Sequence, residues 1–323
     1  MKKKIVIGVI LGAVLLYLSF RGIRFQSVAD GLKNIGYGYV IAALLIMFLI
    51  QAFRALRWGA ILEPLEKVDQ LLLFAVTNVG FLAIIAIPAR LGELARPYLI
   101  NQKTHITLSS ALGTILIERL SDIFTIMLML AVSLIFLSMP PWLVKPGILL
   151  FLTTMATTTT VVFMVMQPER SLRIIKRILG LLPDKYALLL NRFVSQLIDG
   201  LAVIKNPRCL LRIIFFSLII WSINVLAIYL LFLAFGFDLS PVAAFILMVV
   251  LLVGITIPTA PGFIGNWHYF CILALGLFGI AKAEALTFAV VYHFLSVGII
   301  TILGLIFLPF YSFSLSNLRE RDN

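Results

Sequence analysis

Long apolar runs, separated by short stretches that hold most of the charges, dominate the pattern along the chain. Six of these runs approach the length at which a helix crosses the hydrocarbon core of a bilayer, about 20 mainly apolar residues. They cover residues 5–20, 39–55, 107–138, 147–166, 209–235 and 285–308. The pattern predicts an all-α polytopic membrane protein with six full crossings, organised as a single transmembrane domain over residues 1–323.

The basic residues are distributed unevenly around these runs. If the amino terminus is cytoplasmic, Arg90, Arg96 and Arg119 fall at membrane depth. The outer stretches then hold only Arg21, Arg24, Lys33, Lys145 and Lys282. All other Lys and Arg residues, including Arg54 and Arg57, fall on the cytoplasmic side. Because cytoplasmic loops of membrane proteins carry an excess of Lys and Arg, we expect a multi-pass cell-membrane protein with both termini in the cytoplasm.

Two further apolar segments, 71–102 and 241–280, do not fit six simple crossings. The first follows Lys67 and ends beside Lys103, which are both assigned to the cytoplasm, and the second ends beside the outer residue Lys282. Each segment must therefore enter and leave the membrane on one side if the charge bias is to hold. We predict two re-entrant helical hairpins, entering from opposite faces in an inverted-repeat arrangement.

The predicted hairpin tips share the pattern Pro-x-x-(Leu/Ile)-Gly-(Glu/Asn), which reads PARLGE at 88–93 and PGFIGN at 261–266. Proline removes a backbone donor and glycine permits a sharp turn, so both tips should interrupt a helix. The tip residues are Pro88, Gly92, Pro258, Pro261, Gly262 and Gly265. Broken helices of this kind direct helix amino termini, which favour anions, at a site near the bilayer midplane.

Charged residues at membrane depth gather beside the first tip and in the run 107–138. They are Arg90, Glu93, Arg96, Glu118, Arg119 and Asp122. Ionisable groups inside a membrane are costly and usually functional, and arginine forks bind phosphate well. We predict that these residues bind an anionic headgroup, with Asn266 and His268 of the second tip as further ligand contacts. His293 and Asn224 are weaker candidates, and a purely structural ion-pair network is the alternative.

The segment 169–208 has a different pattern. Leu172, Ile175 and Leu179 recur at helical spacing, and basic residues occupy the opposite face. This pattern predicts a pair of basic amphipathic helices on the cytoplasmic leaflet. The net charge of +12 follows from this topology and gives no reason to expect nucleic-acid binding. Cys209 and Cys271 form no metal or disulfide motif, and neither a metal nor a cofactor is expected.

Three motifs, taken in order, resemble the lysylphosphatidylglycerol synthase transmembrane-region family of flippase-like proteins. They are PARLGELAR at 88–96, ERLSD at 118–122 and PTAPGFIG at 258–265. In the multiple peptide resistance factors of that family, such a domain moves a lipid that an attached soluble synthase has made. Since no soluble domain precedes Asn323, the resemblance implies translocation without aminoacyl transfer. His268 stands where many relatives have glutamate.

The resulting hypothesis is a membrane lipid translocase that binds an anionic phospholipid or lipid-linked headgroup in a polar cavity near the midplane, with no catalytic residues. One alternative is an intramembrane enzyme in which Glu93, Glu118 and Asp122 hold Mg²⁺. Another is a non-catalytic partner of a separate synthase or glycosyltransferase in lipid or glycolipid biosynthesis. The pattern leaves the lipid, the driving force and the oligomeric state open.

Overall fold

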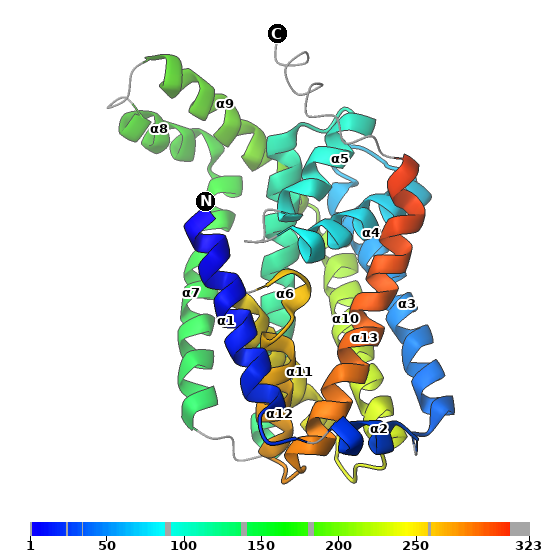
Figure 1. The fold of residues 1–323 in the computed structure, drawn as a ribbon. Helices are drawn as coiled ribbons and strands as arrows, with labels where there is room; N and C mark the ends of the chain where they lie inside the picture. The colour runs from blue at the N-terminus through cyan, green and yellow to red at the C-terminus, as the bar shows by residue number, and fades with distance from the viewer. Residues whose placement is uncertain are drawn as a thin grey trace.

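A computed structural model describes residues 2–23, 25–33, 35–87, 92–136, 141–179, 184–257 and 260–310, and these residues fold into helices and short connections. Each of the six predicted crossings corresponds to one long helix. These helices are α1 (Lys2–Phe20), α3 (Tyr37–Leu62), α6 (Leu108–Phe136), α7 (Pro141–Met166), α10 (Pro207–Ala234) and α13 (Lys282–Phe307). They form a bundle in which the start of α1 and the end of α13 lie toward the same end (Figure 1). This arrangement of long apolar helices is that of a helical membrane protein.

The length and composition of the helices fit a membrane environment. Within the described ranges, the stretches Tyr37–Leu62, Pro207–Ala234 and Lys282–Phe310 are long and apolar enough to cross a bilayer. Many large apolar side chains on the helices are exposed, Leu45 at 61% and Phe294 at 74% among them. In water such exposure would be unfavourable, whereas lipid tails accommodate it.

Both predicted hairpin segments are interrupted helices. The first contains α4 (Gln70–Ala86) and α5 (Ala95–Lys103), and the second contains α11 (Pro241–Thr256) and α12 (Asn266–Gly276). Helices α4 and α5 lie in the upper half of the bundle, and α11 and α12 lie in the lower half (Figure 1). A short 3₁₀ turn precedes the second helix of each pair, at 92–94 and at η3 (Pro261–Phe263).

Capping residues define where several helices begin. The Asp69 carboxylate accepts a hydrogen bond from the Leu72 N–H at 2.9 Å at the start of α4. Asn206 caps α10 and Ser240 caps α11 in the same manner, each followed by a proline in the first turn. Such caps satisfy the free N–H groups of a first turn, and proline there sacrifices no helical hydrogen bond.

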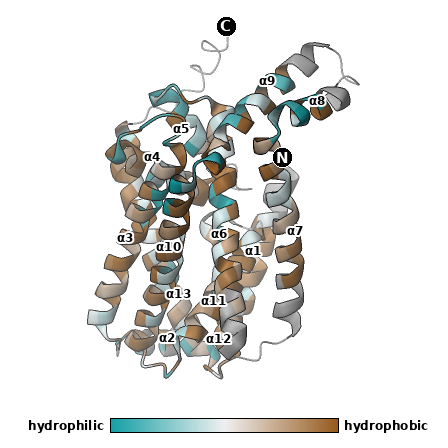
Figure 2. Ribbon diagram, turned by 180° about the vertical axis from the view of Figure 1, so that it is seen from behind, coloured by the Kyte–Doolittle hydropathy of each residue, from teal (hydrophilic) through white to brown (hydrophobic). Residues whose placement is uncertain are grey.

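The predicted amphipathic segment forms α8 (Pro168–Leu179), α9 (Asp184–Gly200) and η2 (Ala202–Lys205). Hydrophilic residues gather at this end of the bundle (Figure 2). Helix α9 also packs tightly on α6, because a Cβ at Gly200 would lie 2.0 Å from the Ser110 carbonyl oxygen. The Ser110 hydroxyl donates to the Gln196 carbonyl at 2.9 Å. The segment is therefore anchored to the bundle by the end of α9, which the amphipathic pattern alone did not predict.

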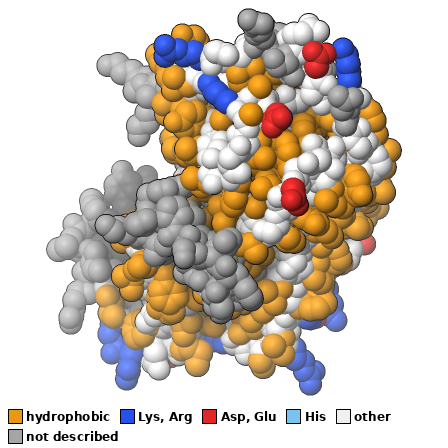
Figure 3. All heavy atoms as spheres, turned by 90° about the horizontal axis from the view of Figure 1, so that it is seen from below, with side chains coloured by type: hydrophobic (Ala, Val, Ile, Leu, Met, Phe, Trp, Pro, Cys, Tyr) orange, Lys and Arg blue, Asp and Glu red, His pale blue; other side chains and the backbone are white. Residues whose placement is uncertain are grey.

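The opposite end of the bundle carries α2 (Phe25–Lys33) and the connection between α12 and α13. Viewed from that end, basic and acidic side chains are scattered among hydrophobic and uncharged atoms (Figure 3). The interior contains two apolar clusters. One joins α10 to α13 around Phe232 and Phe288, whose rings are 5.4 Å apart, and the other joins α3 to α6 around Trp58 and Leu99. Buried charges lie beside the second cluster.

Candidate functional site

Arg96 and Glu118 form the centre of a buried charged network. Both guanidinium nitrogens Nη1 and Nη2 of Arg96 donate to the two carboxylate oxygens of Glu118, at 2.8 and 3.0 Å. Both side chains are 2% exposed. This two-point geometry is the strongest way in which arginine binds a carboxylate. It links the returning helix of the first interrupted segment, α5, to the long helix α6, in the kind of ion-pair network that the sequence analysis gave as the alternative to a ligand site.

Arg57 of α3 completes the network, and the sequence analysis did not identify it. Its Nη1 donates to Asp122 Oδ1 at 2.5 Å and to the Ser217 hydroxyl of α10 at 3.0 Å, and its Nη2 lies 3.6 Å from Glu118 Oε1. Asp122 Oδ1 also accepts from Trp221 Nε1 at 3.0 Å. The sequence analysis placed Arg57 in a connecting segment beyond the helix, whereas α3 continues to Leu62 and Arg57 is buried within its last turns.

Small and aromatic neighbours hold Arg96 in position. A Cβ at Gly80 of α4 would lie only 2.1 Å from Arg96 Cγ, so the missing side chain provides the space for the arginine stem. The guanidinium carbon lies 4.2 Å from the centre of a Trp58 ring, a cation–π contact. Trp58 is itself oriented by its Nε1–H, which donates to the Thr114 hydroxyl of α6 at 3.1 Å. Side chains and backbone of α3, α4 and α6 thus hold the Arg96 side chain of α5 in place.

The charges of four buried side chains cancel, namely Arg57, Arg96, Glu118 and Asp122. Their hydrogen-bond donors, however, outnumber the acceptors that they contact. Each guanidinium has five N–H donors, and a carboxylate only accepts. The Nε atoms of both Arg57 and Arg96 are buried without a hydrogen-bond partner. Unsatisfied donors inside a protein are costly, and they are rare without a structural or functional reason. The network therefore has spare capacity for an additional acceptor.

Arg119 lies at the margin of this network. Its side chain is 40% exposed and its Nη1 is 3.5 Å from Asp122 Oδ2. The expectation that Arg119 is buried with the other charges was wrong. Arg119 follows Glu118 directly on α6, so its side chain points to a different face of the helix, which is more exposed. The charged residues thus extend from the interior to the surface of the bundle.

Two of the residues predicted for the tip of the first break cannot be compared with the structure. Arg90 and Pro88 lie outside the described residues, whereas Glu93 is partly exposed in the turn at 92–94. Gly92 is buried, and a Cβ there would lie 2.2 Å from the Ala83 carbonyl oxygen. Glycine at this position therefore lets the returning chain approach α4 closely.

At the second break, Asn266 is a structural cap. Its Nδ2 donates to the carbonyls of Gly254 and Ile257 at 3.2 and 3.3 Å, where α11 ends. Gly262 and Gly265 have φ angles of 70° and 95°, which favour glycine, and Pro261 opens the turn between them and α11. Gly265 also packs against α1, because a Cβ there would be 2.1 Å from the Gly12 carbonyl oxygen. Pro258 is outside the described residues.

His268 lies beside His293, with their ring centres 4.9 Å apart. His293 Nε2 is 2.7 Å from the Gly262 carbonyl oxygen, which links α13 to the second break. His268 Nδ1 and Trp267 Nε1 are buried without a partner. Asn224 donates to the Ile220 carbonyl of its own helix. The two breaks approach each other, since α4 packs on η3 and Ile85 lies near Gly262.

The carboxylates of the network are engaged by cations and donors, which does not suit the Mg²⁺ site of the enzyme hypothesis. Both oxygens of Glu118 accept from Arg96, and Asp122 accepts from Arg57 and Trp221. Over the part of the chain that the structure describes, no three His, Cys, Asp or Glu side chains are grouped to hold a metal ion.

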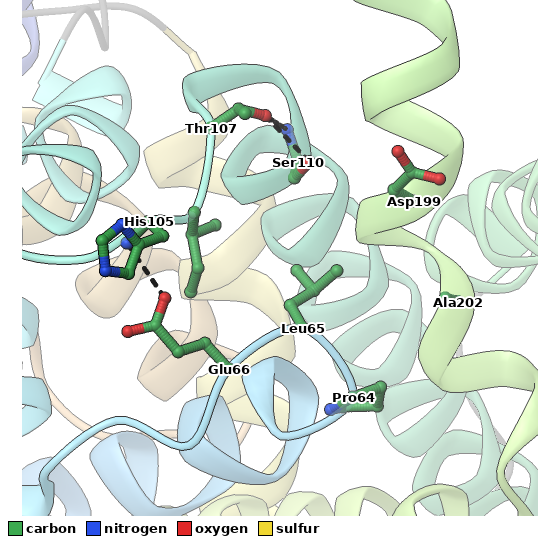
Figure 4. A pocket seen from close by; sticks show the side chains of 9 residues that line it. Pro64, Leu65, Glu66, His105, Thr107, Ser110, Asp199 and Ala202 are labelled. Carbon is green, nitrogen blue, oxygen red and sulfur yellow. Dashed lines mark hydrogen bonds between the residues drawn. The ribbon is translucent and has the colours of Figure 1, made fainter.

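A separate hollow of about 380 Å³ opens at the end that carries α9. Glu66 and Asp199 line it from two sides, and Glu66 accepts a hydrogen bond from the backbone N–H of His105 at 2.9 Å (Figure 4). None of the residues predicted to bind a ligand lines this hollow. The polar cavity near the midplane stays a prediction.

The fold and the buried charges define a class, a helical membrane protein with two interrupted segments and a buried ion-pair network. The profile of the lysylphosphatidylglycerol synthase TM region matches residues 5–304. The chain therefore belongs to this family, which confirms the resemblance carried by its three motifs.

Individual relatives come from archaea. A UPF0104 membrane protein of Methanothermobacter thermautotrophicus is 24% identical, and the alignment covers 98% of both chains. A UPF0104 membrane protein of Methanocaldococcus jannaschii is 26% identical over 73% of this chain and 96% of its own length. Glycosyltransferase AglD of Haloferax volcanii is 24% identical over 90% of this chain, but the match spans only 51% of AglD.

Proposed function

We propose that this protein moves a membrane lipid with an anionic, phosphate-containing headgroup between the two leaflets. The headgroup passes through the protein beside the charged network, and the acyl chains stay in the bilayer. Membership of the family supports a role in the membrane, and the likeness to part of AglD is compatible with a substrate from lipid or glycolipid biosynthesis.

The observation that carries the proposal is the excess of buried donors in the network. Arg57 and Arg96 are balanced in charge by Glu118 and Asp122, and each still has an unpartnered Nε–H. A phosphate oxygen is an acceptor that such a donor binds strongly. Because the charges of these four buried side chains cancel, they are folded without an uncompensated charge among them, and a bound ligand replaces one of their bonds.

Access to the network is provided by its partly exposed margin. Arg119 is 40% exposed and lies 3.5 Å from Asp122, which is bound to Arg57. A headgroup that first meets Arg119 can pass to the interior by exchanging one arginine partner for the next. Under this proposal, Arg119 captures the phosphate and the buried pair accepts it.

The two interrupted segments provide the moving parts. We propose that they are re-entrant hairpins from opposite faces of the membrane, between six full crossings, with both chain ends in the cytoplasm. The placement of α4 and α5 at one end of the bundle and α11 and α12 at the other supports this arrangement (Figure 1). The contact between α4 and η3 supports a meeting point near the middle of the membrane.

The proposal assigns no catalytic step to the chain. The second candidate function is that of a non-catalytic membrane partner of a glycosyltransferase, which the match to about half of AglD favours. Copurification of a soluble synthase or glycosyltransferase through α8 and α9, together with failure to move any lipid, would support the partner function instead. Metal-dependent conversion of a lipid by the purified protein would contradict both.

The test is leaflet exchange in liposomes that contain the purified protein and fluorescent lipids with different headgroups. We expect faster exchange of lipids whose headgroup carries a net negative charge than of zwitterionic ones. Arg119→Gln should slow that exchange about tenfold, the effect of losing about 1.4 kcal/mol from one charge-assisted contact. Arg96→Lys keeps the charge but cannot form the two-point bond, so it should also slow exchange.

Arg212→Gln is the matched control, because Arg212 is 49% exposed and pairs with Glu63 at the end of α3. It should leave the exchange rate unchanged. Failure of correctly folded wild-type protein to exchange any headgroup would refute the proposal. Equal slowing by Arg119→Gln and Arg212→Gln would remove the evidence for a specific site.

A further inference from the structure

The proposed function leaves the histidine pair at the second break without a role. His268 is on α12 and His293 is on α13, and their ring centres are 4.9 Å apart. His268 is only 7% exposed. Trp267 stacks edge-on with His293 and Tyr292 at 5.3 and 5.1 Å, so both imidazoles lie in an aromatic cluster. Two imidazoles in contact, one buried and one partly buried, are an uncommon arrangement that needs a physical reason.

The hydrogen bonds of the pair leave ring nitrogens available to bind a proton. A carbonyl oxygen only accepts, so His293 Nε2 must carry the hydrogen that binds the Gly262 carbonyl at 2.7 Å. In neutral His293 the remaining nitrogen, Nδ1, is therefore an acceptor. His268 Nδ1 is buried with no partner. The pair thus offers free nitrogen positions that an added proton would occupy.

Among the residues that the structure describes, neither imidazole pairs with a carboxylate, although Glu284 lies in the first turn of α13 and Asp30 lies on α2, which packs on α13. Within their bounds, α4 and α11 contain no titratable side chain. Tyr269 and Cys271 of α12 and Tyr292 of α13 are the neutral titratable neighbours on the same helices. Tyr17 of α1 is exposed, and Arg54 of α3 lies over the Phe81 ring, 4.7 Å from its centre. Among these groups, His268 and His293 are the two whose neutral side chains become positively charged when they take up a proton.

Two imidazolium ions at this separation would repel each other strongly, so the pair holds one extra proton at most. The proton changes the second break directly. A charged His293 donates a stronger hydrogen bond to Gly262, because charge-assisted bonds exceed neutral ones. Gly262 has a φ of 70° and stands in the turn that separates α11 from α12. Proton uptake therefore tightens the connection between α13 and this turn, and proton release loosens it.

We propose that His268 and His293 form a proton-binding site that takes up one proton per pair and couples it to the movement of the second break. The coupling part rests on the proposed function, since the proton would drive the anionic lipid. One proton enters from water, resides on an imidazole nitrogen and leaves to water on the other side as the break rearranges. The positive charge also offsets that of an anionic headgroup at the meeting point of the two breaks.

Proton binding is tested without any transport assay. The protein contains three histidines, and we would record the ¹⁵N spectra of its imidazoles in nanodiscs as a function of pH. The expected result is that His268 and His293 share one titration step, and that His268→Gln changes the titration of His293. His105→Gln identifies the third signal, which should be unaffected. Independent titration of the two imidazoles, each unchanged when the other is replaced, would overturn the shared site.

Coupling is tested by imposing a pH difference across the liposomes used for lipid exchange. One proton per lipid predicts that a difference of one pH unit shifts the steady-state ratio of labelled lipid between leaflets about tenfold. His293→Gln retains a donor for Gly262 but does not titrate, so exchange should persist without a response to the gradient. His268→Asn provides a second variant if His293→Gln does not fold, and His105→Gln is the control.

The outcomes separate the two proposals. Exchange that ignores the gradient in wild-type protein would refute coupling and leave translocation intact. A complete lack of exchange would refute translocation, and with it the coupling, while the shared titration step would still establish or exclude the proton site.

Discussion

Gly80 of α4 and Arg96 of α5 fit together so closely that a Cβ on the glycine would lie 2.1 Å from the arginine Cγ. Arg96 passes over this bare stretch of α4 to reach both carboxylate oxygens of Glu118. The position of a charged side chain in the network thus depends on an uncharged residue of another helix.

Replacing Gly80 with alanine should displace Arg96 and weaken its bond to Glu118. We expect a loss of about 1–3 kcal/mol in the free energy of unfolding, as for other overpacked interiors. Gly298→Ala in α13 is the control, because a Cβ there meets nothing within 4 Å and alanine favours a helix. Unfolding in mixed micelles measures both variants. Equal stability of the two would contradict the tight fit at Gly80.

Removing the charge of Glu118 should destabilise the protein far more than removing a surface charge. Glu118→Gln leaves Arg96 buried without its partner, at a cost of about 3–5 kcal/mol. Glu63→Gln removes the partner of exposed Arg212 and should cost less than about 1 kcal/mol. The free energies of unfolding of these two variants provide the comparison.

The double variant Arg96→Gln/Glu118→Gln tests whether the cost comes from an unpaired charge. It should recover part of the stability that Glu118→Gln loses, because neither buried charge remains. If the effects of the two substitutions simply added, the pairing of these residues would not be the source of the loss.

Asn266→Leu should destabilise the second break. The substitution preserves much of the volume but leaves the carbonyls of Gly254 and Ile257 without their side-chain donor, at a cost of about 1–3 kcal/mol. Asn224→Leu is the control, since among the described residues the Asn224 amide donates to Ile220 in its own helix and to no other helix. Hydrogen exchange at the end of α11 should accelerate in the first variant alone, and the same acceleration in the second would argue against a capping role.

Gly200→Ala should separate α9 from α6. A Cβ at Gly200 would lie 2.0 Å from the Ser110 carbonyl oxygen, so the two backbones must move apart. We expect faster proteolysis between α8 and α9 and faster hydrogen exchange in α9. Gly276→Ala, where a Cβ meets nothing within 4 Å, should change neither. Unchanged proteolysis of Gly200→Ala would show that this contact does not hold α9.

The long helices and both interruptions were predictable because hydrophobic length and the Pro and Gly pattern determine them locally. The six apolar runs each became one helix, and the segments 71–102 and 241–280 both break where the shared tip pattern occurs. Arg96, Glu118 and Asp122 were also identified, since a charge inside an apolar run is costly and is seldom kept without a function.

The remaining site residues depend on tertiary contacts that a linear pattern does not contain. Arg57 was placed in a connecting segment because the apolar run was ended at residue 55, whereas the helix continues to Leu62 and buries it. The spacing of three between Gln51, Arg54 and Arg57 was the available signal, since these residues fall on neighbouring positions of one helix face. The capping role of Asn266 and the contact of His268 with His293 required knowledge of which helices pack together.

Under the proposed function, the balance of charge in the network bears on how lipid movement responds to membrane voltage. Arg57 and Arg96 are cancelled by Glu118 and Asp122, so these four side chains experience almost no net force from an electric field across the bilayer. An anionic headgroup bound among them adds one negative charge, whose displacement over 100 mV is worth about 2.3 kcal/mol. Under the proposed function, the field therefore acts on a lipid that crosses without a proton, whereas a lipid that carries one proton with it moves no net charge through the membrane.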